Sequence, residues 1–184
     1  MADAADRSSL DAVVARAGRL DHLVYTAGAP LVLRPVDQLP PELLSSFLGT
    51  GVVGLLNAVA AAAPVLAAGG SITASSGTAA RRPGRRGFAV PAAVTGAVES
   101  LVRALALELA PLRVNAVSPG LTRSPLWRQL PDEQRQEMYE QVGSTLPAGR
   151  VGEVDDVALA FGYLMEQPHA TGSVVTVDGG SVLV

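Results

Sequence analysis

Two residue types are missing from this chain altogether. It contains no cysteine, which excludes disulfide bonds and thiolate metal ligands. It contains no lysine either, because all 14 of its basic residues are arginine. Any mechanism that requires a lysine is therefore excluded for this polypeptide.

Charge is scarce and hydrophobic residues are abundant. Charged residues make up 17% of the 184 residues, hydrophobic residues make up 48%, and the net charge is −3. Mild acidity without a long basic stripe argues against nucleic acid as a partner. No uninterrupted apolar run reaches the roughly 18 to 20 residues of a membrane span, and the polar, acidic N-terminus is unlike a secretory signal. We therefore expect a soluble, cytoplasmic protein with no membrane partner, whose hydrophobic excess is buried in a core or an oligomer interface.

Short β-rich segments alternate with longer segments of helical periodicity. The expected strands are residues 22–26, 71–74, 113–117 and 173–177. The expected helices are an N-terminal one capped by Ser8 or Ser9, one over residues 41–66 stopped by Gly69 and Gly70, and three over 91–110, 131–142 and 153–165. This alternation predicts one α/β domain over residues 1–184, with a parallel sheet covered by helices on both faces.

Four segments resemble the short-chain dehydrogenase/reductase family in their order and spacing. They read DHLVYTAGAP, GGSITASSG, LRVNAVSPGLTRSPLW, and GRVGEVDDVALAFGYLM followed by TGSVVTVDGG. The resemblance implies a Rossmann-like doubly wound sheet. It covers about the C-terminal two-thirds of the family fold, so we expect a truncated sheet of about four strands without the first nucleotide-binding βαβ units.

The family's catalytic residues have poor counterparts in this sequence. In the family, a tyrosine acts as general acid, its pKa is lowered by a lysine four residues later, and a serine and an asparagine assist. Alignment of TGAVESLVRALALELA on the family's helix puts Pro91 at the tyrosine and Thr95 at the lysine. The asparagine position holds Gly51, and Ser76 matches the serine only approximately, so Ser76 alone is kept as a catalytic candidate.

The positions of the glycines and of two loops indicate whether this chain is expected to bind a cofactor. Gly49, Gly51 and Gly54 spell Gly-x-Gly-x-x-Gly, but they lie inside a predicted helix and are expected to serve packing. No cofactor is expected for this chain alone. If NAD(P) binds, the resemblance assigns it to two retained loops, which contain Thr26, Ala27 and Gly28, and Pro119, Gly120 and Ser124.

Three kinds of partner contact follow from the sequence. The small-residue surfaces of residues 41–66 and 91–110 predict a homo-oligomer, and strand 22–26 is expected to be an edge that another chain or segment pairs with. Arg81, Arg82, Arg85 and Arg86 crowd one loop, which is either solvated or a docking site for an acidic or phosphate-bearing partner, such as an acyl carrier or a coenzyme A ester.

Three functions remain open, and the sequence does not identify a substrate. The favoured one is a degenerate member of the family, inactive in hydride transfer, that acts as an oligomerising or regulatory partner. The second is an NAD(P)-dependent oxidoreductase whose nucleotide site is completed elsewhere. The third is a cofactor-independent isomerase, dehydratase or cyclase that uses the old substrate cleft.

Overall fold

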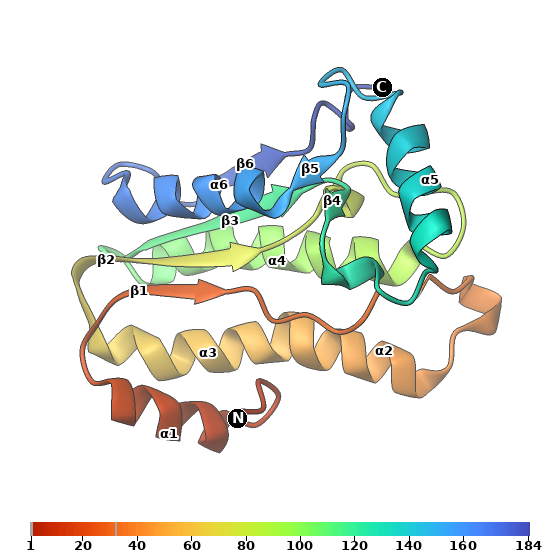
Figure 1. Cartoon of the computed structure of the whole chain (residues 1–184). Helices are drawn as coiled ribbons and strands as arrows, with labels where there is room; N and C mark the ends of the chain where they lie inside the picture. The colour runs from red at the N-terminus through yellow and green to blue at the C-terminus, as the bar shows by residue number, and fades with distance from the viewer. Residues whose placement is uncertain (1, 32) are drawn as a thin grey trace.

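A four-stranded parallel sheet forms the centre of the protein. The computed structural model describes residues 2–31 and 33–184, and its strands follow the order β1-β2-β3-β6 (Figure 1). The strands are β1 (Leu20–Tyr25), β2 (Leu66–Ser75), β3 (Arg113–Pro119) and β6 (Val174–Val177). A separate parallel pair joins β4 (Thr122–Arg123) to β5 (Gly152–Glu153). The predicted parallel sheet of about four strands is confirmed.

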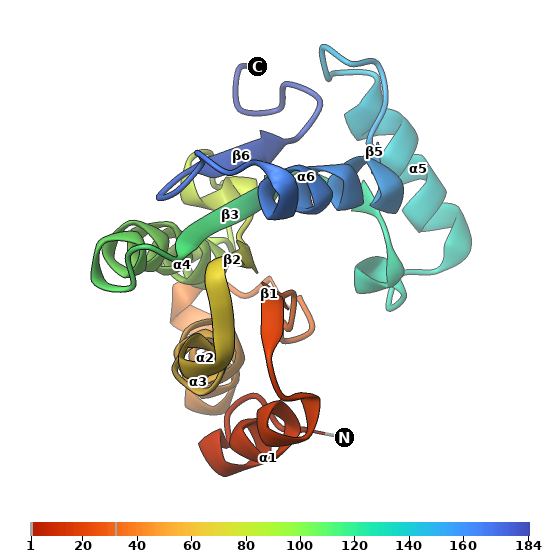
Figure 2. The ribbon, with the colours of Figure 1, turned by 90° about the vertical axis from the view of Figure 1, so that its left-hand side faces the viewer.

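Helices cover both faces of this sheet. They are α1 (Arg7–Ala17), α2 (Pro41–Leu48), α3 (Gly54–Ala62), α4 (Ala89–Glu108), α5 (Asp132–Gly143) and α6 (Val154–Glu166). In the view along the strands, α3 and α4 lie on one side of the sheet and α6 on the other, while α1 lies outside against α3 (Figure 2). The layers are those of a doubly wound α/β domain.

The side-chain alternation of β2 and β3 explains these layers. Ile72 on β2 and Val114 on β3 are register partners, and both are fully buried in the larger core cluster with residues of α3 and α4. Val117 faces the opposite side and joins the second cluster, which includes Phe161 and Leu164 of α6. Because both faces of these central strands are buried, the sequence shows a nearly continuous apolar or small-residue run in each.

Two helix boundaries differ from the sequence-based prediction. The carboxylate of Asp6, and neither Ser8 nor Ser9, caps α1 by accepting the backbone N–H of Ser8 at 2.9 Å. Gly69 and Gly70 do not stop the second helical run, because they lie inside β2. The α3 helix ends at Ala62 and continues as a 3₁₀ turn that contains Pro64, whose missing N–H and ring disfavour further α-helix.

A π-helical turn, Gly49–Val53, joins α2 to α3. The buried hydroxyl of Tyr25, at the end of β1, donates a hydrogen bond to the Thr50 carbonyl in this turn. A Cβ atom at Gly54 would collide with the same hydroxyl. Burial raises the pKa of Tyr25 above its usual value, so the phenol is a neutral donor at physiological pH. The contact ties the end of β1 to the irregular part of the helix.

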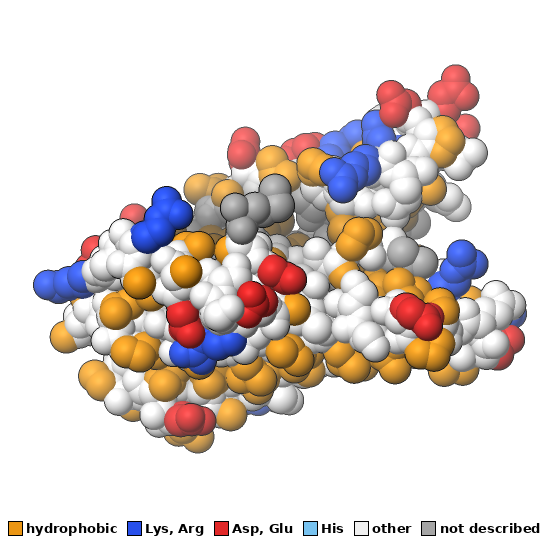
Figure 3. Space-filling model, turned by 90° about the horizontal axis from the view of Figure 1, so that it is seen from below, with side chains coloured by type: hydrophobic (Ala, Val, Ile, Leu, Met, Phe, Trp, Pro, Cys, Tyr) orange, Lys and Arg blue, Asp and Glu red, His pale blue; other side chains and the backbone are white. Residues whose placement is uncertain are grey.

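Two helical runs are long and apolar enough to cross a membrane by length and composition, Pro41–Val65 and Ala89–Glu108. In this fold one side of each run lies on the sheet, yet only 28% of the most apolar stretch of each is buried. From the side of α1 and α3, hydrophobic side chains extend along the molecule with isolated charges between them (Figure 3). Much of the apolar surface of these helices is therefore uncovered.

The first strand is an edge of the sheet within the part of the chain that the structure describes. It pairs in parallel with β2, and no described residue pairs with its other side. Leu23 and Tyr25 point into the core beside α3, whereas His22 and Val24 are exposed on the opposite face. β1 is thus an edge strand, as predicted. One of its faces is also exposed, and one of its sides has no paired strand among the described residues.

Substitution of Leu164 tests the packing of the second core cluster. Its side chain is fully buried, so L164A should lower the free energy of unfolding by about 2–5 kcal/mol, through lost burial and the cavity that remains. The control is L159A on the same helix, because Leu159 is 75% exposed and its loss should change stability by less than about 0.5 kcal/mol. Urea denaturation measures both, and equal effects would show that α6 does not pack as described.

Tyr25 tests the link to the π-helical turn. Y25F removes the hydroxyl and leaves the Thr50 carbonyl without its donor, which should cost about 1–2 kcal/mol of unfolding free energy. Y163F serves as control, because Tyr163 is 52% exposed and its hydroxyl has no hydrogen bond among the described residues. A Y25F protein as stable as wild type in urea would contradict the assignment.

Candidate functional site

The carboxyl ends of all four strands of the main sheet meet at one edge (Figure 1). The chain leaves that edge after Tyr25, Ser75, Pro119 and Val177. Ligand sites of open α/β sheets lie outside this edge, because helix N-termini and loops converge there. The catalytic and cofactor-binding residues predicted from the sequence lie in these loops or in the helices beside them.

Ser76 follows β2 directly and is half-buried. Its backbone N–H donates to the Val117 carbonyl at 2.7 Å, which continues the ladder between β2 and β3. Its hydroxyl donates to the Thr95 carbonyl of α4 at 3.1 Å. The fold therefore brings Ser76 and Thr95 together, as the resemblance implies for the serine and lysine positions, but the contact joins a hydroxyl to a helix carbonyl.

Pro91 and Thr95 cannot supply the chemistry of a tyrosine and a lysine. Pro91 lies in the first turn of α4, where its missing N–H costs the helix nothing, and its ring is buried. The Thr95 hydroxyl donates to the Pro91 carbonyl at 2.8 Å within the same helix. Pro91 thus has no acidic proton to transfer, and the Thr95 hydroxyl already donates its hydrogen bond within the helix. Neither position carries a cation.

The space beside Gly51 is filled by a side chain that the sequence alone did not indicate. Gly51 lies in the π-helical turn, and a Cβ atom there would collide with Cγ1 of Val94 on α4. An asparagine in this backbone would have to displace the valine. A glycine at position 51 and a valine at position 94 are therefore required together by packing. A single sequence cannot show this, because Gly51 and Val94 lie on different helical segments.

Gly54 and Gly120 also have close neighbours, whereas a Cβ atom at Gly49 would meet nothing within 4 Å, so the packing role predicted for Gly49 is wrong. Gly54 contacts Tyr25 and Ala4. The Gly-x-Gly-x-x-Gly pattern lies in the π-helical turn and at the start of α3, so it does not form a strand-to-helix turn. Gly120, one of the residues assigned to a nucleotide, has to be glycine because a Cβ atom would lie 2.8 Å from the Cα of Asp178. The close approach of Asp178 therefore accounts for a glycine at this position.

The nucleotide-side residues fit a cofactor only in part. Thr26, Ala27 and Gly28 form an exposed loop, and a Cβ atom at Gly28 would meet nothing within 4 Å. Ser124 is engaged, because its hydroxyl accepts the backbone N–H of Leu126 at 3.4 Å and caps a 3₁₀ turn. Pro119 ends β3 beside Val177. The part of the chain that the structure describes therefore has an exposed loop surface at this edge. It has no glycine-rich turn between a strand and a helix to hold a pyrophosphate.

The four arginines of the loop before α4 do not form one cluster. Arg81 lies 3.5 Å from the buried carboxylate of Glu99 and donates to the Thr176 hydroxyl at 3.0 Å, and Arg82 donates to the Ser181 carbonyl. These two join the loop to β6 and the C-terminal segment. Structural contacts therefore use donors of Arg81 and Arg82, and docking of an acidic or phosphate-bearing partner at the four arginines stays a prediction.

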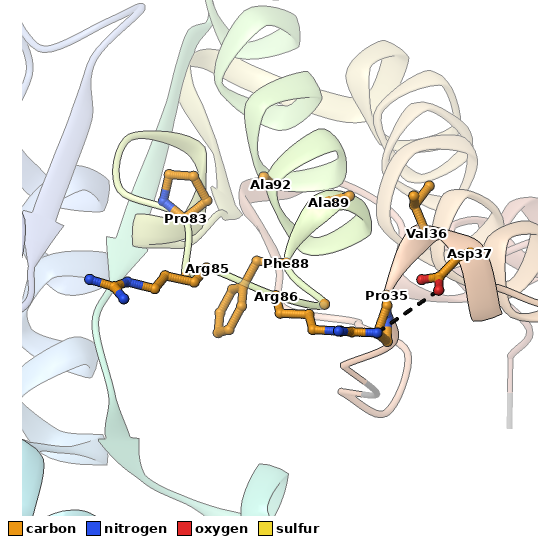
Figure 4. A pocket seen from close by; sticks show the side chains of 11 residues that line it. Pro35, Val36, Asp37, Pro83, Arg85, Arg86, Phe88, Ala89 and Ala92 are labelled. Carbon is orange, nitrogen blue, oxygen red and sulfur yellow. Dashed lines mark ion pairs between the residues drawn. The ribbon is translucent and has the colours of Figure 1, made fainter.

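Arg85 and Arg86 instead line a groove of about 680 Å³ (Figure 4). Its walls come from two segments, residues 35–37 after β1 and residues 83–92 at the start of α4. Arg86 lies 3.9 Å from Asp37 across the groove, and Arg85 makes no hydrogen bond or ion pair with any described residue. Among the described residues, no three metal-ligating side chains gather at this groove or elsewhere.

Comparison with known proteins identifies the family. The family described as Enoyl-(Acyl carrier protein) reductase matches residues 2–182. A putative ketoacyl reductase 2 of the granaticin polyketide synthase of Streptomyces violaceoruber is 38% identical over 184 residues, which cover 97% of this chain and 72% of that protein. The short-chain dehydrogenase/reductase ATR9 of Stachybotrys chlorohalonatus is 36% identical, over 94% of this chain and 68% of its own length.

A solved structure agrees with these relatives. The crystal structure of a small-chain dehydrogenase in complex with NADPH superposes with a TM-score of 0.96 at 36% identity, over 100% of this chain and 83% of that one. The fold, the order of the motifs and the sequence relatives lead to the same conclusion. This chain belongs to the short-chain dehydrogenase/reductase family.

Proposed function

We propose that this protein does not transfer hydride by itself and acts as an oligomerising or regulatory partner. One observation carries the proposal: Pro91, Thr95 and Gly51 occupy the positions of the tyrosine, lysine and asparagine, and Val94 fills the space beside Gly51. A general acid contributes about 10²–10⁴ to a reaction rate, so its loss alone removes most of the family's chemistry. Ser76 remains, with its hydroxyl directed to a backbone carbonyl.

The exposed helices support an oligomer. Large apolar side chains lie uncovered on α2, in the π-helical turn, on α3 and on α4, namely Leu44, Leu48, Val53, Leu56 and Leu107. The same runs have only 28% of their most apolar stretches buried. Uncovered apolar area of this kind, on neighbouring helices, favours association with a second copy through residues 41–66 and 91–110.

A second candidate is an NAD(P)-dependent oxidoreductase whose nucleotide site is completed by residues outside this polypeptide. It is supported by the open side of β1, next to the exposed Thr26–Gly28 loop, and by the NADPH bound to a solved relative. An unpaired strand edge is a surface that another strand can extend. Under this candidate, a complementing segment would pair with β1 and supply the glycine-rich turn.

Calorimetric titration with NADPH separates the two candidates. The 184-residue protein should show no saturable heat up to millimolar NADPH, because none of its described residues forms the turn that holds a pyrophosphate. A complete reductase of the family, titrated in the same buffer, serves as positive control. Micromolar binding to this chain would overturn the first candidate and favour the second.

The oligomer interface has its own test. V53D/L56D places two carboxylates on the uncovered apolar surface and should convert the oligomer to monomers in sedimentation velocity. V13D/L126D is the matched control: Val53 and Leu56 are 47% and 39% exposed, Val13 and Leu126 are 46% and 44% exposed, and the control pair lies outside α2, α3 and α4. The assignment fails if wild type is a monomer or if both double variants dissociate alike.

A further inference from the structure

Two buried polar atoms beneath α4 have no hydrogen-bond partner among the described residues. One is Oε1 of Glu99, a residue of this helix that is 8% exposed. The other is the hydroxyl oxygen of Ser118, which lies near the end of β3 and is fully buried. Buried polar groups of folded proteins nearly always have a partner, so both atoms require an explanation.

The contacts of Arg81 connect these two atoms in one polar cluster. Its Nε lies 3.5 Å from Glu99 Oε2, and its Nη1 donates to the Thr176 hydroxyl at 3.0 Å. Thr176 is the register partner of Ser118 across β3 and β6, so their side chains lie next to each other on the sheet face that α4 covers. The carboxylate and the Ser118 hydroxyl therefore approach the same buried region, one from the helix and one from the sheet.

The chemistry of the two atoms defines what can bridge them. Glu99 and Ser118 are not bonded to each other, and the nearby Ser76 hydroxyl already donates to the Thr95 carbonyl at 3.1 Å. A carboxylate oxygen accepts hydrogen bonds, whereas a hydroxyl donates one and also accepts. A bridging molecule therefore has to donate to Glu99 and accept from Ser118, and it has to be small because both residues are buried. Water meets all three requirements.

We propose that an internal water molecule lies beneath α4, where it donates a hydrogen bond to Glu99 Oε1 and accepts one from the Ser118 hydroxyl. The water completes a network in which Glu99 holds Arg81, and Arg81 holds the loop before α4 against β6. Folded proteins contain about one buried water per 27 residues, typically bonded to otherwise unpaired polar groups. The proposal goes beyond the proposed function and does not depend on whether a nucleotide or a second copy binds.

A crystal structure of the wild-type protein, at a resolution that shows ordered waters, tests the position of this molecule. Density for one water should lie about 2.5–3.0 Å from both Glu99 Oε1 and Ser118 Oγ. The proposal is overturned if density is missing there or reaches only one of the two atoms. A direct hydrogen bond between the carboxylate and the hydroxyl would overturn it as well.

Magnetic relaxation dispersion of the solvent tests the same site in solution, because it counts long-lived internal waters. S118A removes one anchor of the water and should lower the count by about one. T73V is the matched control, because Thr73 is also fully buried with an unpartnered hydroxyl. It lies on the opposite face between Val24 and Asn115, whose amide already bonds to backbone groups, so T73V should leave the count unchanged. Equal counts in S118A and wild type, or an equal loss in T73V, would reject the site.

Hydrogen exchange tests the part of the water in holding the loop. The backbone N–H groups of Arg81 and Arg82 both donate to the Thr78 carbonyl. In S118A these two amides should exchange about three- to tenfold faster than in wild type, because the loop opens more often once Glu99 loses its bridge to β3. T73V should leave their exchange unchanged. Wild-type exchange rates in S118A would contradict this part of the proposal.

Discussion

Burial of β2 and β3 on both faces is the constraint on which the rest of this structure depends. A parallel strand with one face in water would expose apolar side chains and leave its crossover helix without a surface to cover. Helices α3 and α4 cover one face by packing on Ile72 and Val114, and α6 covers the other face by packing on Val117. The same arrangement brings the strand ends to one edge, so the position of the candidate site follows from the core.

The approach of the second helical run to α4 connects this core to the residues at the family's catalytic positions. The π-helical turn puts Gly51 against Val94, and Tyr25 fixes the turn by bonding to the Thr50 carbonyl. In a close-packed interior, a side chain cannot be added at such a contact without moving its neighbour. The glycine at position 51 and Val94 therefore form one packing arrangement, which is consistent with the proposed role that does not need the asparagine.

The uncovered surface of the helical runs bears on what the protein can do. The uncovered apolar sides of the helical runs suit a second copy of the chain, because association buries area that the sheet leaves exposed.

The sequence by itself determined the family, the parallel sheet, the strand edge at β1 and the residues at the catalytic positions, because each depends on local periodicity or on motif order. Its errors were local too: Asp6 caps α1, and Gly69 and Gly70 belong to β2. Only the tertiary structure decided that Val94 fills the space beside Gly51, and that Arg81 and Arg82 are engaged while Arg85 and Arg86 line a groove. These outcomes depend on contacts between residues far apart in the chain, and no spacing along one sequence records which side chains meet across two helices.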